Sequence, residues 1–206
     1  TCLNNSTLFV DQSSGNPTQW FWDFGEPSSG PNNNSTQQNP GHTYSSSGIF
    51  TVMLIATSSF GCIDTILQTI IVNPLPFVNF SPTTVCVGIA SQFSDLSTIN
   101  SGSMVSWQWN FGDPSSGPNN ISNIQNPSHY YITGGLYIVL LTVTSDSGCQ
   151  NSTSLPVYVA PPPTANFIAT DACFNSANGY TDASLGASQW YWQFGDMTTS
   201  TLQNPT

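Results

Sequence analysis

The sequence predicts an all-β protein built from tandem β-sandwiches in a rod-like array, and three observations lead to that prediction. One aromatic stretch occurs three times, at Trp20–Glu26, Trp107–Asp113 and Trp190–Asp196, with a period of about 85 residues, close to the length of a small sandwich domain. Long apolar stretches with strand-like alternation follow the first two copies. Short proline-rich segments separate the units, and segments of that composition act as stiff spacers.

The repeat divides the chain into units at residues 1–73, 77–160 and 164–206. The second unit has an apolar segment, Phe77–Phe80, ahead of its first cysteine, whereas the first unit has only Thr1 in that place. We therefore expect the first unit to lack its opening strand, so that the exposed edge is either covered by another chain or frayed. The third unit stops before a long apolar strand, which predicts a partial unit in a segment of a longer polypeptide.

The strongest strand signals are two long apolar segments, Ile49–Thr57 and Leu136–Thr144. Their apolar residues alternate with a period of two, which is typical of central strands. A short polar turn follows each segment, and a second strand comes next, at Ile66–Val72 in the first unit and Leu155–Val159 in the second. Each of these two units is therefore expected to end in a β-hairpin, and no long helix is predicted.

The aromatic stretch is expected to be a strand with its Trp and Phe side chains in the core. Period-two spacing places these pairs on one face: Trp22 with Phe24, Trp109 with Phe111, and Trp192 with Phe194. A sugar-stacking platform is the alternative for aromatic residues in such a pattern. The residue between each pair is Asp23, Asn110 or Gln193, so the shared structure does not require a carboxylate, which weighs against a catalytic acid or a fixed metal ligand.

The charge composition excludes several classes of partner and chemistry. The chain has no Lys or Arg and ten Asp and Glu residues among its 206. Without cationic side chains to neutralise phosphates, neither nucleic acid nor an anionic membrane surface is expected as a partner. A Lys Schiff base and an Arg phosphate clamp are excluded in the same way. Membrane insertion is not expected, because no apolar run approaches the roughly 18 residues of a membrane span.

No catalytic residue, cofactor-binding residue or metal ligand is predicted, and the chain is not expected to be an enzyme. His42 and His129 occupy matching positions in two units, which favours hydrogen-bonded turn residues over acid/base catalysts. No Cys/His cluster has zinc spacing. Calcium is the one cofactor for which oxygen ligands are present, at the acidic residues beside the loops (Asp23, Glu26, Asp113 and Asp196), but too few carboxylates converge in any short stretch to predict a site.

The order of motifs closely resembles the PKD domain family over almost the whole chain. The first motif is W-x-W-[DNQ]-F-G-[DE], the second is Asn39–Tyr44 or Asn126–Tyr131, and the third is a Gly followed by a strand of the form aromatic-x-Val-x-Leu. The resemblance implies an immunoglobulin-like β-sandwich. It also implies a generally non-catalytic spacer or binding module in extracellular proteins.

Two further motifs resemble the PKD repeats of very long surface and secreted proteins of the Bacteroidota. They are the loop Gly-[DE]-Pro-Ser-Ser-Gly-Pro-Asn-Asn, at residues 25–33 and 112–120, and the Gly-Cys that follows the long strand. This resemblance implies type IX secretion, an extracellular or cell-surface location, and roles in adhesion or gliding. Asn110 and Gln193 replace the motif Asp and depart from the family pattern at the calcium site described for some members.

Repetition without catalytic residues predicts a non-catalytic structural stalk or fibre segment of an extracellular adhesin. Its expected partners are neighbouring PKD units of the same long chain, other chains in a fibre, and surface polysaccharide. The alternative is a carbohydrate-binding accessory region of a secreted polysaccharide-degrading enzyme. That alternative requires Trp20, Trp107 and Trp190, the outer members of the Trp pairs, to line one solvent-facing strip.

The cysteines recur at fixed places, with Cys2, Cys86 and Cys173 early in the units and Cys62 and Cys149 late in the first two. Regular use of this kind in a secreted chain predicts disulfides. One scheme pairs Cys2 with Cys62 and Cys86 with Cys149, within units, and leaves Cys173 to a partner beyond the segment.

The other scheme is staggered and pairs Cys2 with Cys149 across two units, leaving the other three cysteines to neighbours outside the segment. In an immunoglobulin-like sandwich the first turn and the final hairpin turn lie at opposite poles, and a strand of about six residues already spans roughly 20 Å. Bonded cysteines have Cα atoms less than about 7 Å apart. The staggered scheme therefore suits a head-to-tail rod, and both schemes remain open from the sequence.

Overall fold

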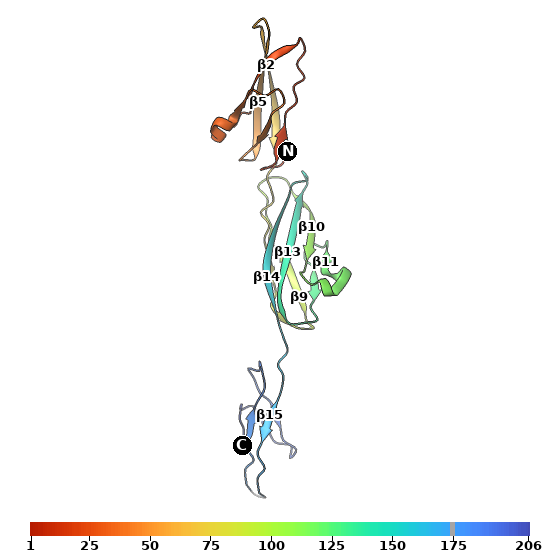
Figure 1. The fold of residues 1–206 in the computed structure, drawn as a ribbon. Helices are drawn as coiled ribbons and strands as arrows, with labels where there is room; N and C mark the ends of the chain where they lie inside the picture. Colours follow the sequence, from red (N-terminus) through yellow and green to blue (C-terminus); the bar gives the residue numbers. More distant parts are fainter. Residues whose placement is uncertain (174–175) are drawn as a thin grey trace.

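The protein is a row of three β-rich units, described here for residues 1–173 and 176–206 in a computed structural model. Figure 1 shows the units following one another along one axis, with the chain termini in the first and last units. The predicted all-β, tandem sandwich architecture is confirmed. No helix in the described parts of the chain is long and apolar enough to span a membrane.

The first unit packs a four-stranded sheet against a two-stranded one. The larger sheet has the order β3–β2–β5–β6 and the smaller one pairs β1 with β4. The strands are β1 (Ser6–Leu8), β2 (Pro17–Asp23), β3 (Asn34–Ser35), β4 (Gly41–Thr43), β5 (Gly48–Ser58) and β6 (Ile63–Val72). The predicted closing hairpin is the β5–β6 pair, and it is longer than the sequence pattern indicated.

The second unit has the same plan with one more strand in each sheet. Its sheets have the orders β11–β10–β13–β14–β8 and β12–β9–β7. The strands are β7 (Phe80–Pro82), β8 (Val85–Cys86), β9 (Ala90–Asp95), β10 (Met104–Asn110), β11 (Ile121–Ser122), β12 (Ser128–Tyr130), β13 (Gly135–Ser145) and β14 (Gln150–Ala160). The smaller sheet thus has three strands here and two in the first unit, because β7 lies on the outer side of β9.

The third unit consists of two small antiparallel pairs. They join β15 (Phe167–Ala169) to β16 (Tyr180–Asp182) and β17 (Trp192–Gln193) to β18 (Thr199–Ser200). Phe167, Tyr180 and Trp192 contact one another edge-on or tilted, which repeats part of the aromatic core of the other units.

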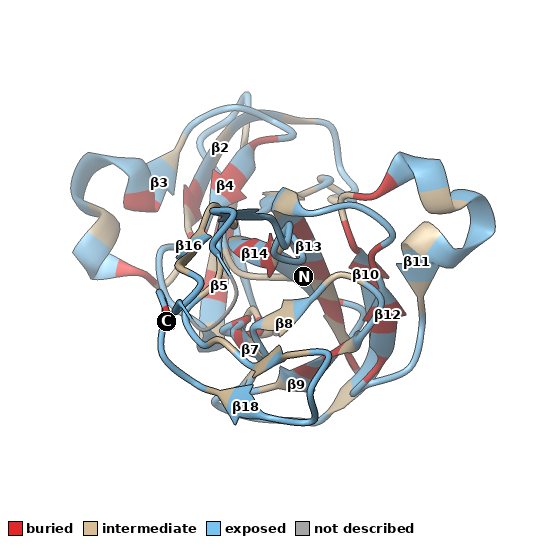
Figure 2. Ribbon diagram, turned by 90° about the horizontal axis from the view of Figure 1, so that it is seen from below, coloured by how far each residue is buried: buried red, intermediate tan, exposed pale blue. Residues whose placement is uncertain are grey.

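The loop shared by the first two units forms two short 3₁₀ turns with a kink between them, at Gly30 in η1 (Pro27–Asn33) and at Gly117 in η2 (Pro114–Asn120). A proline stands at the start of each helix, where its fixed φ is favourable and its missing N–H is not needed. Seen along the rod in Figure 2, the two helices project on opposite sides, beside β3 and β11. The first two units therefore present this loop in opposite directions.

The core of each complete sheet pair is built from the aromatic stretch and the central hairpin. In the second unit Trp109, Phe111, Val139 and Leu141 are all buried. The predicted inward face of the aromatic stretch is confirmed at these positions. Burying each such side chain stabilises the fold by roughly 1.5–3 kcal/mol.

Candidate functional site

The joint between the first two units, residues 73–76, is crossed by a disulfide. Cys2 is bonded to Cys149 with a Cα–Cα distance of 5.6 Å and a sequence separation of 147. Cys2 forms a parallel β-bridge with Asn73, at the end of the first unit that adjoins the joint. Cys149 lies in the turn between β13 and β14 of the second unit. This is the staggered pairing. The bond joins the first unit to the second and forms no cross-link within either unit.

One side of this bond and part of the joint are buried. Cys149 is buried, as are Pro74 and Pro76 of the joint. The side-chain amide of Asn151 donates a 2.9 Å hydrogen bond to the carbonyl oxygen of Pro76. The first joint is therefore held by a covalent bond, a hydrogen bond and burial together.

The second joint differs from the first in its surroundings. Residues 161–163 are exposed, and the described part of the third unit contains no long hairpin that corresponds to β13–β14.

The other three cysteines, Cys62, Cys86 and Cys173, are exposed thiols. Cys62 follows β5 just as Cys149 follows β13. Cys86 pairs in parallel with Ala160 at the base of the second unit, the place that Cys2 occupies in the first. Cys62 therefore corresponds to Cys149, and Cys86 corresponds to Cys2, the two residues that the disulfide joins.

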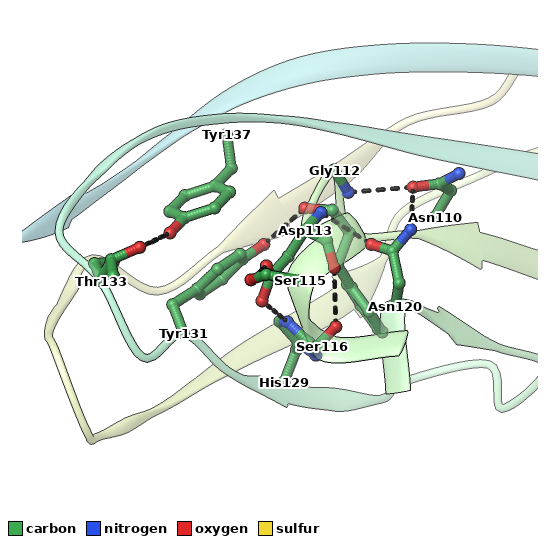
Figure 3. A network of polar contacts seen from close by, with 11 residues as sticks. Asn110, Gly112, Asp113, Ser115, Ser116, Asn120, His129, Tyr131, Thr133 and Tyr137 are labelled. Atoms are coloured by element: carbon green, nitrogen blue, oxygen red, sulfur yellow. Dashed lines mark hydrogen bonds and ion pairs between the residues drawn. The ribbon is translucent and has the colours of Figure 1, made fainter. Parts of the chain in front are cut away.

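A second group of residues forms a buried polar network in each of the first two units, shown for the second unit in Figure 3. His129 Nε2 lies 3.2 Å from Asp113 Oδ2, and the imidazole ring stacks on Phe111 with centroids 4.4 Å apart. Ser115 Oγ donates to Asp113 Oδ1. Tyr131 OH donates a 3.0 Å hydrogen bond to the carbonyl oxygen of Phe111. The network thus ties β12 to the turn that follows β10.

The first unit repeats the network with a longer carboxylate. His42 Nε2 lies 3.1 Å from Glu26 Oε2, and Tyr44 OH donates to the carbonyl oxygen of Phe24 at 3.0 Å. Ser45 supplies the partner for the other carboxylate oxygen, through its backbone N–H at 2.9 Å and its hydroxyl at 2.8 Å. The acid and the histidine therefore hold the same elements together in both units.

The electrostatics of the network follow from burial and hydrogen bonding. Burial alone would raise the pKa of Asp113, but hydrogen bonds from Ser115 and His129 outweigh it and lower the pKa of this carboxyl. Glu26 behaves in the same way, with Ser45 as the main donor that lowers its pKa. Burial, helped by the charge of Glu26, raises the pKa of Tyr44 to about 12.

This arrangement suits a structural role. Both carboxylates and both histidines are buried, and each carboxylate is already engaged by a serine and a histidine, so no oxygen is presented to a substrate. The expectation that His42 and His129 are hydrogen-bonded agrees with these contacts, but both residues lie in short strands, β4 and β12, and not in turns as predicted. The role of Glu26 and Asp113 as their partners was missed, although each acid precedes its histidine by 16 residues, a repeated spacing that could have indicated the pairs.

The variable position of the aromatic motif provides an acceptor oxygen. Asp23 Oδ1 accepts from the backbone N–H of Gly25 and from the amide of Asn33, at 2.9 and 2.8 Å. Asn110 Oδ1 accepts the equivalent bonds from Gly112 and Asn120, at 2.9 and 3.1 Å. A carboxylate and an amide therefore accept the same two hydrogen bonds at this position. Residues 1–173 and 176–206 contain no group of three His, Cys, Asp or Glu side chains placed to hold a metal ion.

The outer Trp residues do not form a solvent-facing strip. Trp20, Trp107 and Trp190 are half-buried, and Trp20 and Trp107 pack against the cores of their units. The indole N–H of Trp107 donates to Asp95 Oδ2 at 2.7 Å, and that of Trp20 donates to Asp11 Oδ2 at 2.8 Å. These side chains lie on the same face as Trp22 and Trp109, because period-two alternation includes them, and sit at the edge of the core.

The sequence matches a family model described as PKD domain, once over residues 2–72 and again over residues 73–160. Among solved structures, the chain is similar to the PKD1 domain of Vibrio anguillarum Epp, with 34% identity, a TM-score of 0.38, and coverage of 44% of this chain and 99% of that one. It is also similar to the PKD1 domain of the Vibrio cholerae metalloprotease PrtV, with 27% identity, a TM-score of 0.36, and coverage of 42% and 98%.

Proposed function

The chain belongs to the PKD domain family, and from that premise we propose that it is a structural stalk or fibre segment of an extracellular cell-surface adhesin. Domains of this family are generally extracellular structural or adhesion modules. The observation that carries the proposal is the disulfide between Cys2 and Cys149, which joins consecutive units. The loop and Gly-Cys motifs that resemble Bacteroidota repeats suggest the surface of such a bacterium, reached by type IX secretion, as the setting.

The position of the bond suits a segment that carries tension. A force applied along the rod in Figure 1 has to pass through the joint at residues 73–76. A bond from Cys2 to Cys149 provides a second, covalent connection around that joint. A disulfide inside one sandwich would strengthen that sandwich but would leave the joint to packing and proline alone.

The disulfide also limits how far the segment lengthens if a unit opens. The bond closes a loop that includes most of the first two units, with a sequence separation of 147. At about 3.4 Å per extended residue, this loop withholds roughly 500 Å of chain from extension. The cross-link therefore keeps residues 3–148 from adding length under load when the first two units unfold.

Single-molecule pulling of the 206-residue chain between handles at its two ends tests the proposal. The oxidised chain is expected to extend about 500 Å less than the same chain after reduction. A Cys2→Ser/Cys149→Ser variant should extend like the reduced chain without any reductant. Equal extension of the oxidised and reduced chains would remove the mechanical basis of the proposal.

The carbohydrate-binding alternative is distinguished by a glycan array probed with the same oxidised chain. The stalk proposal expects no saturable binding through the aromatic motif, because the indoles of Trp20 and Trp107 are half-buried and hydrogen-bonded to Asp11 and Asp95. Saturable binding of a polysaccharide that is weakened by Tyr191→Ala, a change at an exposed aromatic residue of the motif, would favour the accessory-region function instead.

A further inference from the structure

The outer face of the larger sheet in the first unit, on the side away from the core, is apolar and exposed. Three apolar pairs lie side by side across β2, β5 and β6: Ile49 with Ile71, Met53 with Leu67, and Phe21 with Ile55. Ile49, Leu67 and Ile71 are 72%, 62% and 60% exposed. These six residues are called the outer face below. A contiguous exposed apolar patch of this extent marks an interaction site.

The second unit shows that this fold does not require an apolar outer face. The closing hairpins of the two units begin in the same register, with Gly48 opposite Val72 and Gly135 opposite Val159, so their residues correspond one to one. The counterparts of Phe21, Ile55 and Leu67 in the second unit are polar: Gln108, Thr142 and Ser154. The three apolar residues of the first unit are therefore not needed to form the sandwich.

The strands of a unit leave this side of the sheet open. The second unit contains β7 and β8 in addition to the strands that it shares with the first, and the corresponding face is still exposed. Leu136 and Tyr158, the counterparts of Ile49 and Ile71, are 66% and 53% exposed there. A second molecule is therefore needed to cover the outer face of the first unit.

The outer face is almost free of charge. Within the described strands β2, β5 and β6, the one carboxylate on this side is Asp23, opposite Met53, and alternation places Asp64 on the other side of the sheet. The chain as a whole has a formal net charge of −10, so two copies repel each other over most of their surface. An uncharged face is where two copies can meet, and it offers no complementary group to a charged partner.

The outer face is large enough for a specific contact. Its six residues and the threonines between them expose roughly 600 Å² in each copy, so that two copies would bury about 1,200 Å², the lower end of the range for stable interfaces. Two sheets pack face to face with their strands within about 30° of each other. Copies related by a twofold axis use the same patch on both sides.

We propose that the outer face of the first unit binds the same face of a second copy of this chain, as a twofold-symmetric dimer. Phe21, Ile55 and Leu67 lie at the centre of the contact, where buried apolar side chains contribute most to affinity. The proposal rests on the stalk function proposed above, which brings copies of the chain side by side, and it names the surface for their lateral contact.

Sedimentation equilibrium of the oxidised chain tests the proposal. A Cys62→Ser/Cys86→Ser/Cys173→Ser background prevents the exposed thiols from linking copies. A dimer with a Kd of about 10–100 µM is expected for an interface of this size. A chain that stays monomeric at about 500 µM would overturn the proposal. Pulling experiments use single chains, so a monomer that still shows the disulfide-limited extension would contradict the lateral contact alone.

The second unit supplies the residues for a variant that keeps the fold. Phe21→Gln/Ile55→Thr/Leu67→Ser introduces the polar counterparts with which the second unit folds. Dimerisation should weaken at least about 100-fold, because each change acts on both sides of a twofold interface. Unchanged dimerisation of this variant would place the contact elsewhere on the chain, and the proposal would be wrong.

Single charges identify the face that forms the contact. Leu67→Asp should weaken dimerisation at least about 30-fold, because it buries two unpaired carboxylates in each dimer. Ser154→Asp makes the same change at the equivalent exposed position of the second unit and should have no effect. Gln68→Asp, on the other side of β6, should also have none. A dimer that only Gln68→Asp dissociates would contradict the proposal.

Neutral phosphatidylcholine vesicles provide the test for a different occupant. The proposal expects that the chain does not cosediment with them, because the outer face is covered by a second copy. Cosedimentation of a monomeric chain that Leu67→Asp abolishes would show that the face binds a lipid surface, and the dimer would be excluded.

Discussion

The carbonyl oxygen of Ile138 lies only 2.4 Å from the point where a Cβ of residue 112 would be placed. Gly112 also has a φ of +68°, in the left-handed region that favours glycine. The first unit has the same arrangement at Gly25, where the distance to the carbonyl oxygen of Thr51 is 2.3 Å. The glycine of the aromatic motif therefore allows the turn after β10 to approach the central strand β13.

We expect Gly112→Ala to destabilise the second unit by about 3 kcal/mol, because the new methyl group meets backbone and adds to the unfavourable φ. Gly88→Ala is the matched control. Gly88 has a φ of +80° but open space around its Cβ position, so only the conformational cost of about 1 kcal/mol remains. Urea unfolding measures both, and equal effects would show that the close approach to Ile138 contributes nothing.

The disulfide predicts that removing Cys149 lowers the free energy of unfolding much more than removing Cys62, although the two cysteines lie in equivalent turns. Cys149→Ala opens the bond to Cys2 and should lower the free energy of unfolding by about 5 kcal/mol in the chain-entropy model for a loop of this size. Cys62→Ala changes an exposed thiol and should alter it by less than about 0.5 kcal/mol. Urea unfolding under non-reducing conditions makes the comparison.

Peptide mapping identifies the bond directly. Trypsin has no site because the chain has no Lys or Arg, so chymotrypsin is the suitable protease. A linked peptide that contains Cys2 and Cys149 is expected without reductant. A peptide that links Cys2 to Cys62 would contradict the staggered pairing and the mechanical proposal built on it.

The buried carboxylates predict loss of stability in acid. The folded-state pKa of Asp113 is lowered from its ordinary value of 3.8. The unfolded chain therefore binds more protons in that range, and this contribution to stability is present above about pH 4 and is lost as the pH falls through the folded-state pKa. Asp113→Asn should make the stability less dependent on pH below about pH 4.

Asp64→Asn is the control for this titration, because Asp64 is exposed on β6. Urea midpoints between about pH 2.5 and 6 should keep the wild-type acid dependence in this variant. If Asp113→Asn and Asp64→Asn have parallel pH profiles, the hydrogen bonds from Ser115 and His129 do not lower the pKa of Asp113.

The strands and the core could be predicted from the sequence because alternation alone determines them. Trp109 and Phe111 are two residues apart on one strand, and such residues share a face whatever the rest of the molecule does. The same rule places Trp107 on that face, although the sequence analysis also allows it to face solvent. Its half-burial depends on how far the core extends, and Asp95, its hydrogen-bond partner, comes from another sheet.

The polar network and the joint could be predicted less well, because they depend on contacts between distant segments. Asp113 follows a strand and precedes Pro114, a context that indicates an exposed loop acid, and its burial becomes favourable through hydrogen bonds from the nearby Ser115 and from the distant His129. The choice between Cys62 and Cys149 as partner of Cys2 required the direction in which units stack. Local sequence patterns do not show in which direction the units stack. The length of the strands nevertheless argues against a bond within one unit, because it separates the two cysteines by more than a disulfide can span.

The last prediction concerns the variable position of the aromatic motif. Asn110 Oδ1 accepts hydrogen bonds from Gly112 and Asn120, and Asp23 accepts the same bonds in the first unit. Asn110→Asp keeps the acceptor and should change the free energy of unfolding by less than about 0.5 kcal/mol. Asn110→Ala removes it and should cost about 1 kcal/mol, because two donors at the turn lose their partner.

Urea unfolding of the two Asn110 variants at pH 7, with and without calcium, separates this explanation from a metal site. An acceptor role predicts that calcium leaves the stability of Asn110→Asp unchanged, since the backbone N–H of Gly112 and the amide of Asn120 already occupy the oxygen. Stabilisation of Asn110→Asp by calcium, with none for the wild-type chain, would instead mean that an Asp at this position acts as a metal ligand and that Asn110 has lost that role.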